Sequence, residues 1–221
     1  ADVDLGLRRE AGGVQPLQHL LLERRLRPRA ALLGARPAGV GRLADVFDQP
    51  ASQVPGLQVR AHPIESYWAG GFLSVTGPRR LAYPLGWGTL GCGFPQGLGA
   101  ALAGTGPVVS LSGDGGFLYA AGELAAAKQE RIPLTAVIVD DGGYGMLRFD
   151  QEIHGDPREG VDLATPDFVA LAGSFGVRAE AVEGLGRAFG AMLAHHLELD
   201  EPSVIVASAA LRPPPNTSPR W

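Results

Sequence analysis

Short apolar runs alternate with helical patterns through the second half of the chain. A strand is expected where such a run stands between turn residues, and a helix where apolar or small residues recur every three or four positions. The predicted strands cover residues 107–111, 133–139, 177–182 and 202–207, and the predicted helices cover 95–103, 117–130, 167–175 and 187–199. This alternation is typical of an α/β fold, a parallel sheet with helices on both faces.

The first half of the chain has a weaker pattern. Leucines at helical spacing predict a helix over residues 14–26, and a short apolar run predicts a strand over 30–33. Residues 34–63 show no clear period. We therefore divide the chain into a tail (1–12), a leading segment of the same domain or a linker (13–64), one domain (65–211) and a Pro-rich C-terminal tail (212–221).

Composition excludes several classes of protein. The chain has 221 residues, 45% of them hydrophobic, and a net charge of -4 with both signs mixed, so we expect no nucleic-acid partner. No stretch approaches the roughly 20 apolar residues that a membrane helix needs. The polar N-terminus does not look like a signal peptide. The single cysteine, Cys92, excludes an internal disulfide framework and fits a cytoplasmic protein.

Two strand ends carry unusual residues. The run 107–111 is followed by Ser-Gly-Asp-Gly-Gly, which contains Asp114, and then by a helix. Glycines let the backbone approach an anion closely, and a helix start provides unpaired N–H groups. A carboxylate beside an anion such as a diphosphate is favourable when a cation lies between them, as in a magnesium site.

The next predicted strand ends in a second acidic, glycine-rich turn, Asp140-Asp141-Gly142-Gly143-Tyr144-Gly145. One helix connects the two strands, so they are expected to be neighbours, with Asp114 and Asp141 facing one crevice. Either turn alone is ordinary, because Gly and Asp favour tight turns. Their occurrence at successive strand ends indicates a site for a hard cation.

These motifs resemble a known family. Gly113-Asp114-Gly115, then 24 residues, then Asp140-Asp141, is similar to the signature of thiamine-diphosphate-dependent enzymes. Residues 83–104 are also similar to the family's stretch that leads into the motif. The resemblance covers residues 65–207 and is to the benzoylformate decarboxylase, acetolactate synthase and pyruvate decarboxylase group, in particular to its diphosphate-binding domain.

The resemblance implies thiamine diphosphate and Mg²⁺ as cofactors and assigns roles to matching positions. Asp114 and Asp141 would bind the metal through side chains, and Gly143 through its carbonyl. Gly88 would accept a hydrogen bond from the aminopyrimidine, and Leu90 would hold the cofactor bent, although Leu90 also fits a plain core position. Ser66 would lie near the diphosphate. The diphosphate itself would be lined, largely by backbone N–H groups, by Gly115, Gly116, Tyr144, Gly145 and Met146.

The chain departs from the family at one place. The family's paired Asn is here Asp140-Asp141. Aspartate is a good magnesium ligand, but it adds negative charge near a diphosphate and should increase the dependence of cofactor binding on the metal. Asp140 is expected to cap the turn.

By resemblance, the whole enzyme would cleave or form a carbon–carbon bond next to the carbonyl of a small 2-oxo acid. Its activating glutamate would come from a separate pyrimidine-binding domain or subunit, which we do not find in these 221 residues. We therefore expect an oligomer, in which segments 88–98 and 117–124 expose apolar surface, and a chain that is inactive alone. Decarboxylation and acetolactate synthase-like carboligation stay open, as does the 2-oxo acid.

The charged stretch 150–165 is interpreted as a loop that could act as a lid, and its His154 either as an acid–base group or as an exposed loop residue. Two other functions remain open. One is a non-catalytic assembly or regulatory subunit with the same fold. The other is a nucleotide-binding oxidoreductase, for which Gly86–Gly91 has the glycine spacing but follows no convincing strand.

Overall fold

The computed structural model describes residues 57–61, 69–70, 73, 77–84, 88–104 and 106–211, all of which belong to one compact unit. The predicted helix over 14–26, the predicted strand over 30–33, Ser66 and the tail 212–221 lie outside the described residues.

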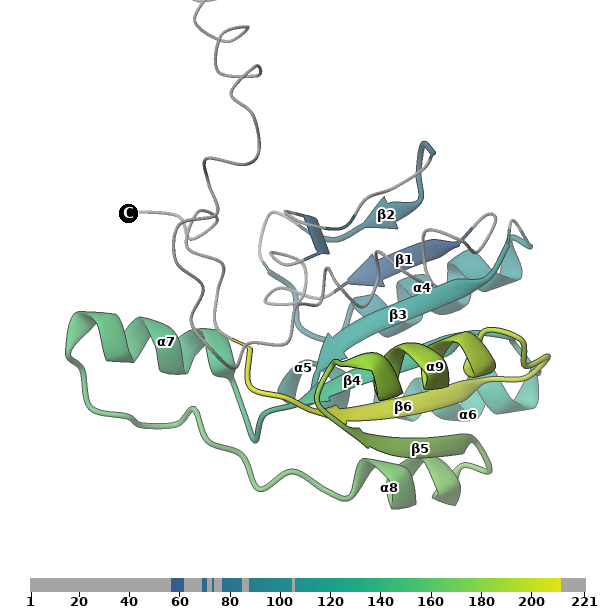
Figure 1. The fold of residues 1–221 in the computed structure, drawn as a ribbon. Helices are drawn as coiled ribbons and strands as arrows, with labels where there is room; N and C mark the ends of the chain where they lie inside the picture. Colours follow the sequence, from purple (N-terminus) through teal and green to yellow (C-terminus); the bar gives the residue numbers. More distant parts are fainter. Residues whose placement is uncertain are drawn as a thin grey trace, which may run out of the picture. The chain divides into compact units, whose positions relative to one another are not determined.

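A six-stranded sheet forms the centre of this unit, and every strand pair in it is parallel (Figure 1). The strand order is β2-β1-β3-β4-β6-β5. The strands are β1 (Gln58–Ala61), β2 (Leu81–Ala82), β3 (Val108–Gly113), β4 (Thr135–Asp140), β5 (Arg178–Glu183) and β6 (Ser203–Ser208). The predicted α/β fold with a parallel sheet is confirmed.

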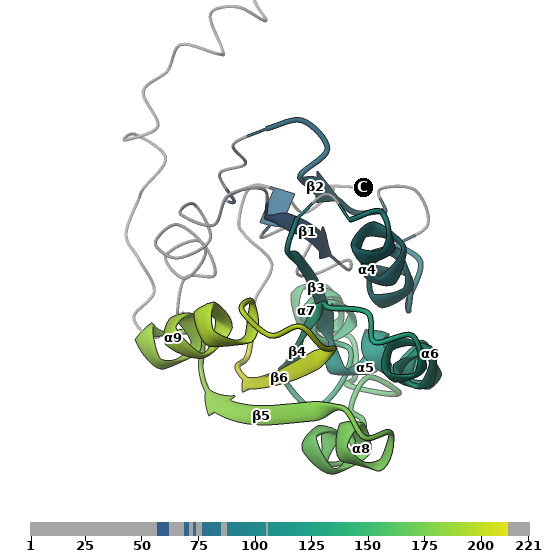
Figure 2. The same ribbon diagram turned by 90° about the vertical axis from the view of Figure 1, so that its right-hand side faces the viewer.

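Helices cover both faces of the sheet (Figure 2). They are α4 (Gly93–Leu102), α5 (Asp114–Leu118), the 3₁₀ turn η3 (Ala121–Glu123), α6 (Leu124–Gln129), α7 (Gly145–His154), α8 (Phe168–Ser174) and α9 (Arg187–His196). Helix α9 packs on one face, and α4, α5, α6 and α8 pack on the other. Helix α7 buries none of its residues and extends beyond the sheet.

The two faces of the sheet follow from alternation along the strands. In β4, Val137 and Val139 contribute to the cluster that contains Phe189 and Leu193 of α9. Ala136 and Ile138 point the other way, into the cluster that contains Phe117, which is 2% exposed. Because both faces are covered, the central strands read as continuous apolar runs, and this is why they could be recognised in the sequence.

Two local predictions need correction. The helix predicted over 117–130 begins earlier, at Asp114, and is divided into α5, η3 and α6. The stretch 150–165, expected to be a loop, is helical up to His154 because α7 occupies its first residues. In addition, the segment 34–63, which showed no clear period, contains β1, and β1 pairs with β3. A four-residue strand is too short to show a period.

The register of β3 and β4 brings the two acidic motifs together. Gly113, the last residue of β3, lies opposite Val139, so Asp114 follows β3 at the same level at which Asp140 ends β4. Both motifs therefore lie at the carboxyl edge of two central, adjacent strands, where ligands of such sheets bind. No helix in the described part of the chain is long and apolar enough to span a membrane.

Candidate cofactor site

Asp114 begins α5 directly after β3 and is completely buried. Its Oδ1 accepts a hydrogen bond from the N–H of Gly115 at 2.7 Å, whereas its Oδ2 is buried with no hydrogen-bond partner. Burial, together with repulsion from Asp141 and Asp140, raises the pKa of Asp114 to about 6, although the hydrogen bond from Gly115 acts to lower it. A buried carboxylate oxygen without a partner is costly, so this position favours a bound cation.

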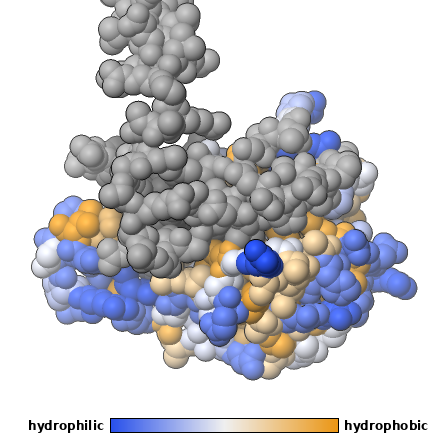
Figure 3. Space-filling model, viewed as in Figure 1, coloured by the Kyte–Doolittle hydropathy of each residue, from blue (hydrophilic) through white to orange (hydrophobic). Residues whose placement is uncertain are grey.

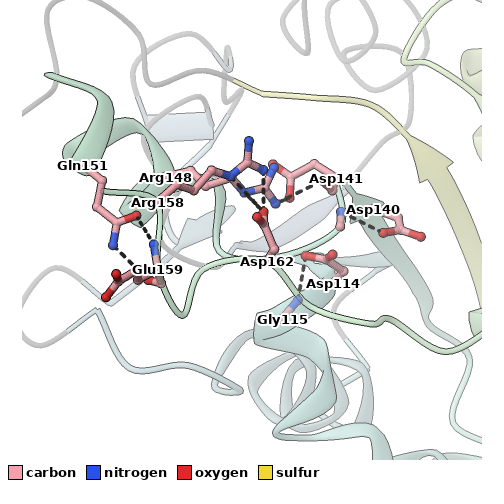
Figure 4. A network of polar contacts seen from close by, with 10 residues as sticks. Asp114, Gly115, Asp140, Asp141, Arg148, Gln151, Arg158, Glu159 and Asp162 are labelled. Atoms are coloured by element: carbon pink, nitrogen blue, oxygen red, sulfur yellow. Dashed lines mark hydrogen bonds and ion pairs between the residues drawn. The ribbon is translucent and has the colours of Figure 1, made fainter. Parts of the chain in front are cut away.

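The second motif follows β4 and is held by its own side chains. Oδ1 of Asp140 accepts from the N–H of Gly142 at 3.2 Å, which confirms the predicted capping of this turn. Asp141 is 12% exposed and forms an ion pair of 2.9 Å with Arg148 of α7. Burial raises the pKa of Asp141, and Arg148 opposes that shift. Figure 4 shows the carboxylates of Asp114 and Asp141 on the same side of the site.

Gly143 is fixed by a returning part of the chain. It forms an antiparallel bridge with Asp162, in which Tyr144 N–H donates to the Val161 carbonyl at 2.8 Å and Leu163 N–H donates to the Gly142 carbonyl at 2.9 Å. These two bonds use the groups of its neighbours and leave the Gly143 carbonyl out of the bridge. The Gly143 carbonyl, which was predicted to bind the metal, is therefore not used by the bridge that holds this residue.

The first turn of α7 lies next to this bridge. An α-helix leaves its first N–H groups without intrahelical partners, and in α7 these include Gly145 and Met146. Tyr144 was also predicted to line the diphosphate. Its N–H donates to the Val161 carbonyl, so Tyr144 would line the site with its ring and not with its backbone N–H. That ring lies over Gly115, which together with Gly116 is buried in the first turn of α5.

Gly88 and Leu90 precede α4. Gly88 has a positive φ of 57°, which suits glycine, and it lies two residues before Leu90. The Leu90 side chain is 37% exposed, so it is not a core residue, and it stays available for contact with a ligand or partner.

The residues present fit a magnesium ion together with a diphosphate. Within the described residues, no three His, Cys, Asp or Glu side chains form a metal-binding group of their own. Magnesium in enzymes is commonly held by one or two carboxylates, with phosphate oxygens and water completing six ligands. The buried carboxylate of Asp114, which has no hydrogen-bond partner at Oδ2, and the largely buried carboxylate of Asp141 match that requirement.

Arg148 and Asp162 belong to the site but were not predicted from the sequence. Arg148 contacts Asp141, and Asp162 lies 3.4 Å from the Nε of Arg148. Neither residue follows a strand or belongs to a glycine-rich motif. The sequence does hold a signal for the end of the helix that carries Arg148. A histidine, His154, is followed by Gly155, and this order is typical of a helix C-terminus; Gly155 indeed has a positive φ of 73°.

His154 does not lie at the site. It occupies the last turn of α7, roughly 13 Å along the helix axis from Gly145. Its Nδ1 lies 2.8 Å from the carbonyl oxygen of Asp150, and the side chain is exposed. The acid–base interpretation therefore gains no support. His154 is exposed, as the alternative interpretation expected, but it lies in a helix and not in a loop.

A hollow of about 290 Å³ lies at the opposite edge of the sheet. Its lining includes Pro107, Thr135 and His196, at the amino ends of the strands and the end of α9. None of the predicted site residues lines it. The convergence of carboxylates and glycines, not this hollow, marks the candidate site.

Comparison with known proteins identifies the family. The family described as "Thiamine pyrophosphate enzyme, C-terminal TPP binding domain" matches residues 65–207 (thiamine pyrophosphate is thiamine diphosphate). The large subunit of acetolactate synthase isozyme 2 from Escherichia coli is 33% identical over 137 residues, which are 61% of this chain and 24% of that protein. A probable 2-ketoarginine decarboxylase from Pseudomonas aeruginosa is 38% identical over 126 residues, 56% of this chain and 20% of that one.

A solved structure of a thiamine diphosphate-dependent enzyme has a similar fold. The thiamine diphosphate-dependent 4-hydroxybenzoylformate decarboxylase of Rhodococcus jostii superposes with a TM-score of 0.69 and 27% identity, over 80% of this chain and 35% of that one. The chain thus spans about a fifth to a quarter of the length of these curated relatives. On its motifs, fold and family match, the chain belongs to the thiamine pyrophosphate enzymes and contains their C-terminal TPP-binding domain.

Proposed function

We propose that this chain holds Mg²⁺ and the diphosphate of thiamine diphosphate in a 2-oxo acid decarboxylase or an acetolactate synthase-like carboligase. One observation carries the proposal: the buried Asp114 carboxylate has an oxygen without a hydrogen-bond partner and lies beside a second carboxylate, that of the largely buried Asp141. A divalent cation there would offset the repulsion between them and would attract a diphosphate.

The residues of the chain would have separate tasks. Asp114, Asp141 and the Gly143 carbonyl would hold the metal. The first N–H groups of α7, at Gly145 and Met146, would donate to the diphosphate. The bound cofactor supplies an electron sink for making or breaking a carbon–carbon bond beside a carbonyl. Gly88 and Leu90 would set the orientation of its aminopyrimidine half.

The reaction class rests on the relatives. Their names describe an acetolactate synthase, a 2-ketoarginine decarboxylase and a 4-hydroxybenzoylformate decarboxylase. We therefore propose that the whole enzyme, like these relatives, makes or breaks a carbon–carbon bond beside the carbonyl of a 2-oxo acid. Because the chain spans only part of these proteins, we further propose that a pyrimidine-binding domain or subunit supplies the activating glutamate.

Exposed apolar side chains at the carboxyl edge support association with such a partner. In the two segments expected to expose apolar surface, Leu90, Leu118 and Tyr119 are exposed, at 37%, 38% and 66%. The other large side chains of these segments, Phe94, Leu98, Phe117 and Leu124, are buried instead. Leu147 and Ile153 of α7 are also exposed, and Figure 3 shows hydrophobic surface at that helix.

Calorimetric titration of thiamine diphosphate tests the proposal. Binding is expected in the presence of Mg²⁺ and should disappear in excess chelator. Asp114→Ala and Asp141→Ala should each abolish binding. Asp141→Asn should keep it, because the amide oxygen remains a ligand. Asp200→Asn is the control, since Asp200 is an exposed carboxylate just ahead of β6, at the opposite edge.

Each alternative function predicts a different outcome. A folded chain that binds no thiamine diphosphate with or without Mg²⁺ would contradict the proposal and favour an assembly or regulatory role. Binding of a dinucleotide without metal would favour an oxidoreductase. Binding that Asp114→Ala leaves unchanged would place the cofactor elsewhere.

A further inference from the structure

One guanidinium joins the candidate metal site to a distant part of the chain. The Nη2 of Arg148 donates to Oδ1 of Asp141 at 2.9 Å and to the Asp141 carbonyl at 3.0 Å. The Nε of the same side chain is 3.4 Å from Oδ1 of Asp162. This Nε is buried and makes no hydrogen bond, so its contact with Asp162 is an ion pair only. Arg148 is therefore held firmly by Asp141 and less firmly by Asp162.

Asp162 belongs to the segment 158–163, here called the return segment, which comes back to the second motif after α7. Arg158 also pairs with Asp162, so charges alternate from Asp141 through Arg148 and Asp162 to Arg158 (Figure 4). The two bridge bonds from Tyr144 and Leu163 tie the same segment to Gly142–Tyr144 through the backbone. Its attachment thus has a backbone part and an ionic part, and the ionic part passes through Arg148.

The carboxylates at this place outnumber the cations. Asp114, Asp140, Asp141 and Asp162 stand against Arg148 and Arg158. At position 141 the chain has a carboxylate where the family pattern has an uncharged Asn, and Arg148 bonds directly to that carboxylate. Arg148 is therefore the counter-ion of the additional charge.

A cation bound at Asp141 would compete with Arg148 for the same carboxylate. Two cations that share one anion each weaken the hold of the other, and the coupling acts equally in both directions. We propose that Arg148 is a positioning residue that couples metal binding at Asp114–Asp141 to attachment of the return segment, in the antagonistic sense. A bound divalent cation loosens the ionic part of the attachment, and loss of Arg148 strengthens binding of the cation. This inference rests on the proposed function.

The test follows two readouts on the full chain. Hydrogen exchange resolved by NMR reports the amides of Tyr144 and Leu163, the two bridge donors. Titration with MgCl₂, without thiamine diphosphate, reports metal affinity. Arg148→Gln should speed exchange of both amides and tighten Mg²⁺ binding, each by about fivefold, as expected for a partly buried ion pair. Addition of Mg²⁺ to the unsubstituted chain should also speed exchange of these amides.

Two further variants separate charge from shape. Arg148→Lys keeps the charge but loses the fork that reaches both carboxylates, so exchange should rise while Mg²⁺ affinity stays near the original value. In an Asp141→Asn background, Arg148→Gln should change Mg²⁺ affinity less than twofold, because the charge that Arg148 balances is gone. Arg178→Gln, which breaks the exposed ion pair with Glu180 on β5, is the control and should change neither readout.

The outcomes are distinguishable. Equal effects of Arg148→Gln in both backgrounds, or weaker Mg²⁺ binding by that variant, would overturn the coupling while leaving the proposed function intact. Slower exchange of Tyr144 and Leu163 on addition of Mg²⁺ would also overturn it. A chain that binds no Mg²⁺ in this titration would overturn the coupling, whereas the proposed function is decided separately, by the titration of thiamine diphosphate in the presence of Mg²⁺.

Discussion

The aromatic ring of Tyr144 lies directly over Gly115. A Cβ built on Gly115 would be 2.6 Å from Cε1 of Tyr144 and 3.1 Å from a methyl of Leu163. These three residues come from the first motif, the second motif and the return segment. The two strand-end motifs therefore meet where the Tyr144 ring lies against the backbone of Gly115, and the ring leaves no room for a side chain at that glycine.

Replacing Gly115 should displace that ring. We expect Gly115→Ala to lower the free energy of unfolding by about 1–3 kcal/mol, as for overpacking of a buried site. Gly122→Ala is the matched control, because a Cβ there meets nothing within 4 Å. Urea unfolding of both variants measures the difference. Equal stabilities would show that Tyr144 moves aside without cost.

Gly143 should tolerate substitution much less than its neighbour. At Gly143, φ is 151° and a Cβ would lie 2.2 Å from the Val161 carbonyl oxygen. At Gly142, φ is 78° and a Cβ meets nothing within 4 Å. Gly142→Ala should therefore cost only backbone strain, about 1 kcal/mol. Gly143→Ala should cost more, or should break the bridge to Asp162, seen as rapid exchange of the Leu163 amide. Similar losses in the two variants would contradict the bridge geometry.

Asp114 should destabilise the metal-free chain above pH 6. Its folded pKa, about 6, is raised above the ordinary 3.8, so between these values the folded state binds more protons than the unfolded state. Stability should fall as pH rises through this window, by up to about 3 kcal/mol from this group. Asp114→Asn should remove that fall. Mg²⁺ should reduce it in the unsubstituted chain, and chelator should restore it. The measurement is urea unfolding from pH 4 to 8.

His196 should have the opposite dependence on pH. Burial lowers its pKa below 6.5 and disfavours the imidazolium, and Arg178 and His195 act in the same direction, whereas Glu180 opposes them. The unfolded chain then takes up the proton more readily, so stability should fall as pH drops below about 6.5. His196→Gln should lessen this loss. His195→Gln, at the exposed neighbouring position, should not. An unchanged acid profile in His196→Gln would show that Glu180 keeps the imidazolium stable.

The sequence was sufficient for those parts of the fold that are buried on both sides. Strand β4 is apolar along its length because helices cover both of its faces, and it was recognised for that reason. The short edge strand β2 and the helix α7 were missed. Strand β2 has only two residues, which are too few to show a period. Helix α7 has Met146, Phe149 and Ile153 at helical spacing, but the charged run 150–165 that overlaps its second half was interpreted as a loop.

The residues of the candidate site also differ in whether the sequence could predict them. Asp114 and Asp141 were predictable because each follows a buried strand, and the register of two adjacent parallel strands brings them together. Arg148 and Asp162 were not. Their meeting depends on how the chain returns after α7, and the ion pair that joins them has no local period or motif. Charge balance around a site is a property of the folded chain rather than of any segment.

The bridge between Gly143 and Asp162 has a consequence for how this protein can vary. The chain leaves the sheet edge at Gly143 and returns to the same place at Asp162, and α7, the helix between them, packs no side chain into the core. Only the outer part of this excursion, residues 149–157, lies beyond the residues that contact the carboxylate motifs. We expect length and composition to vary most there, because a change in that part leaves Tyr144, Gly145, Met146 and Arg148 in place.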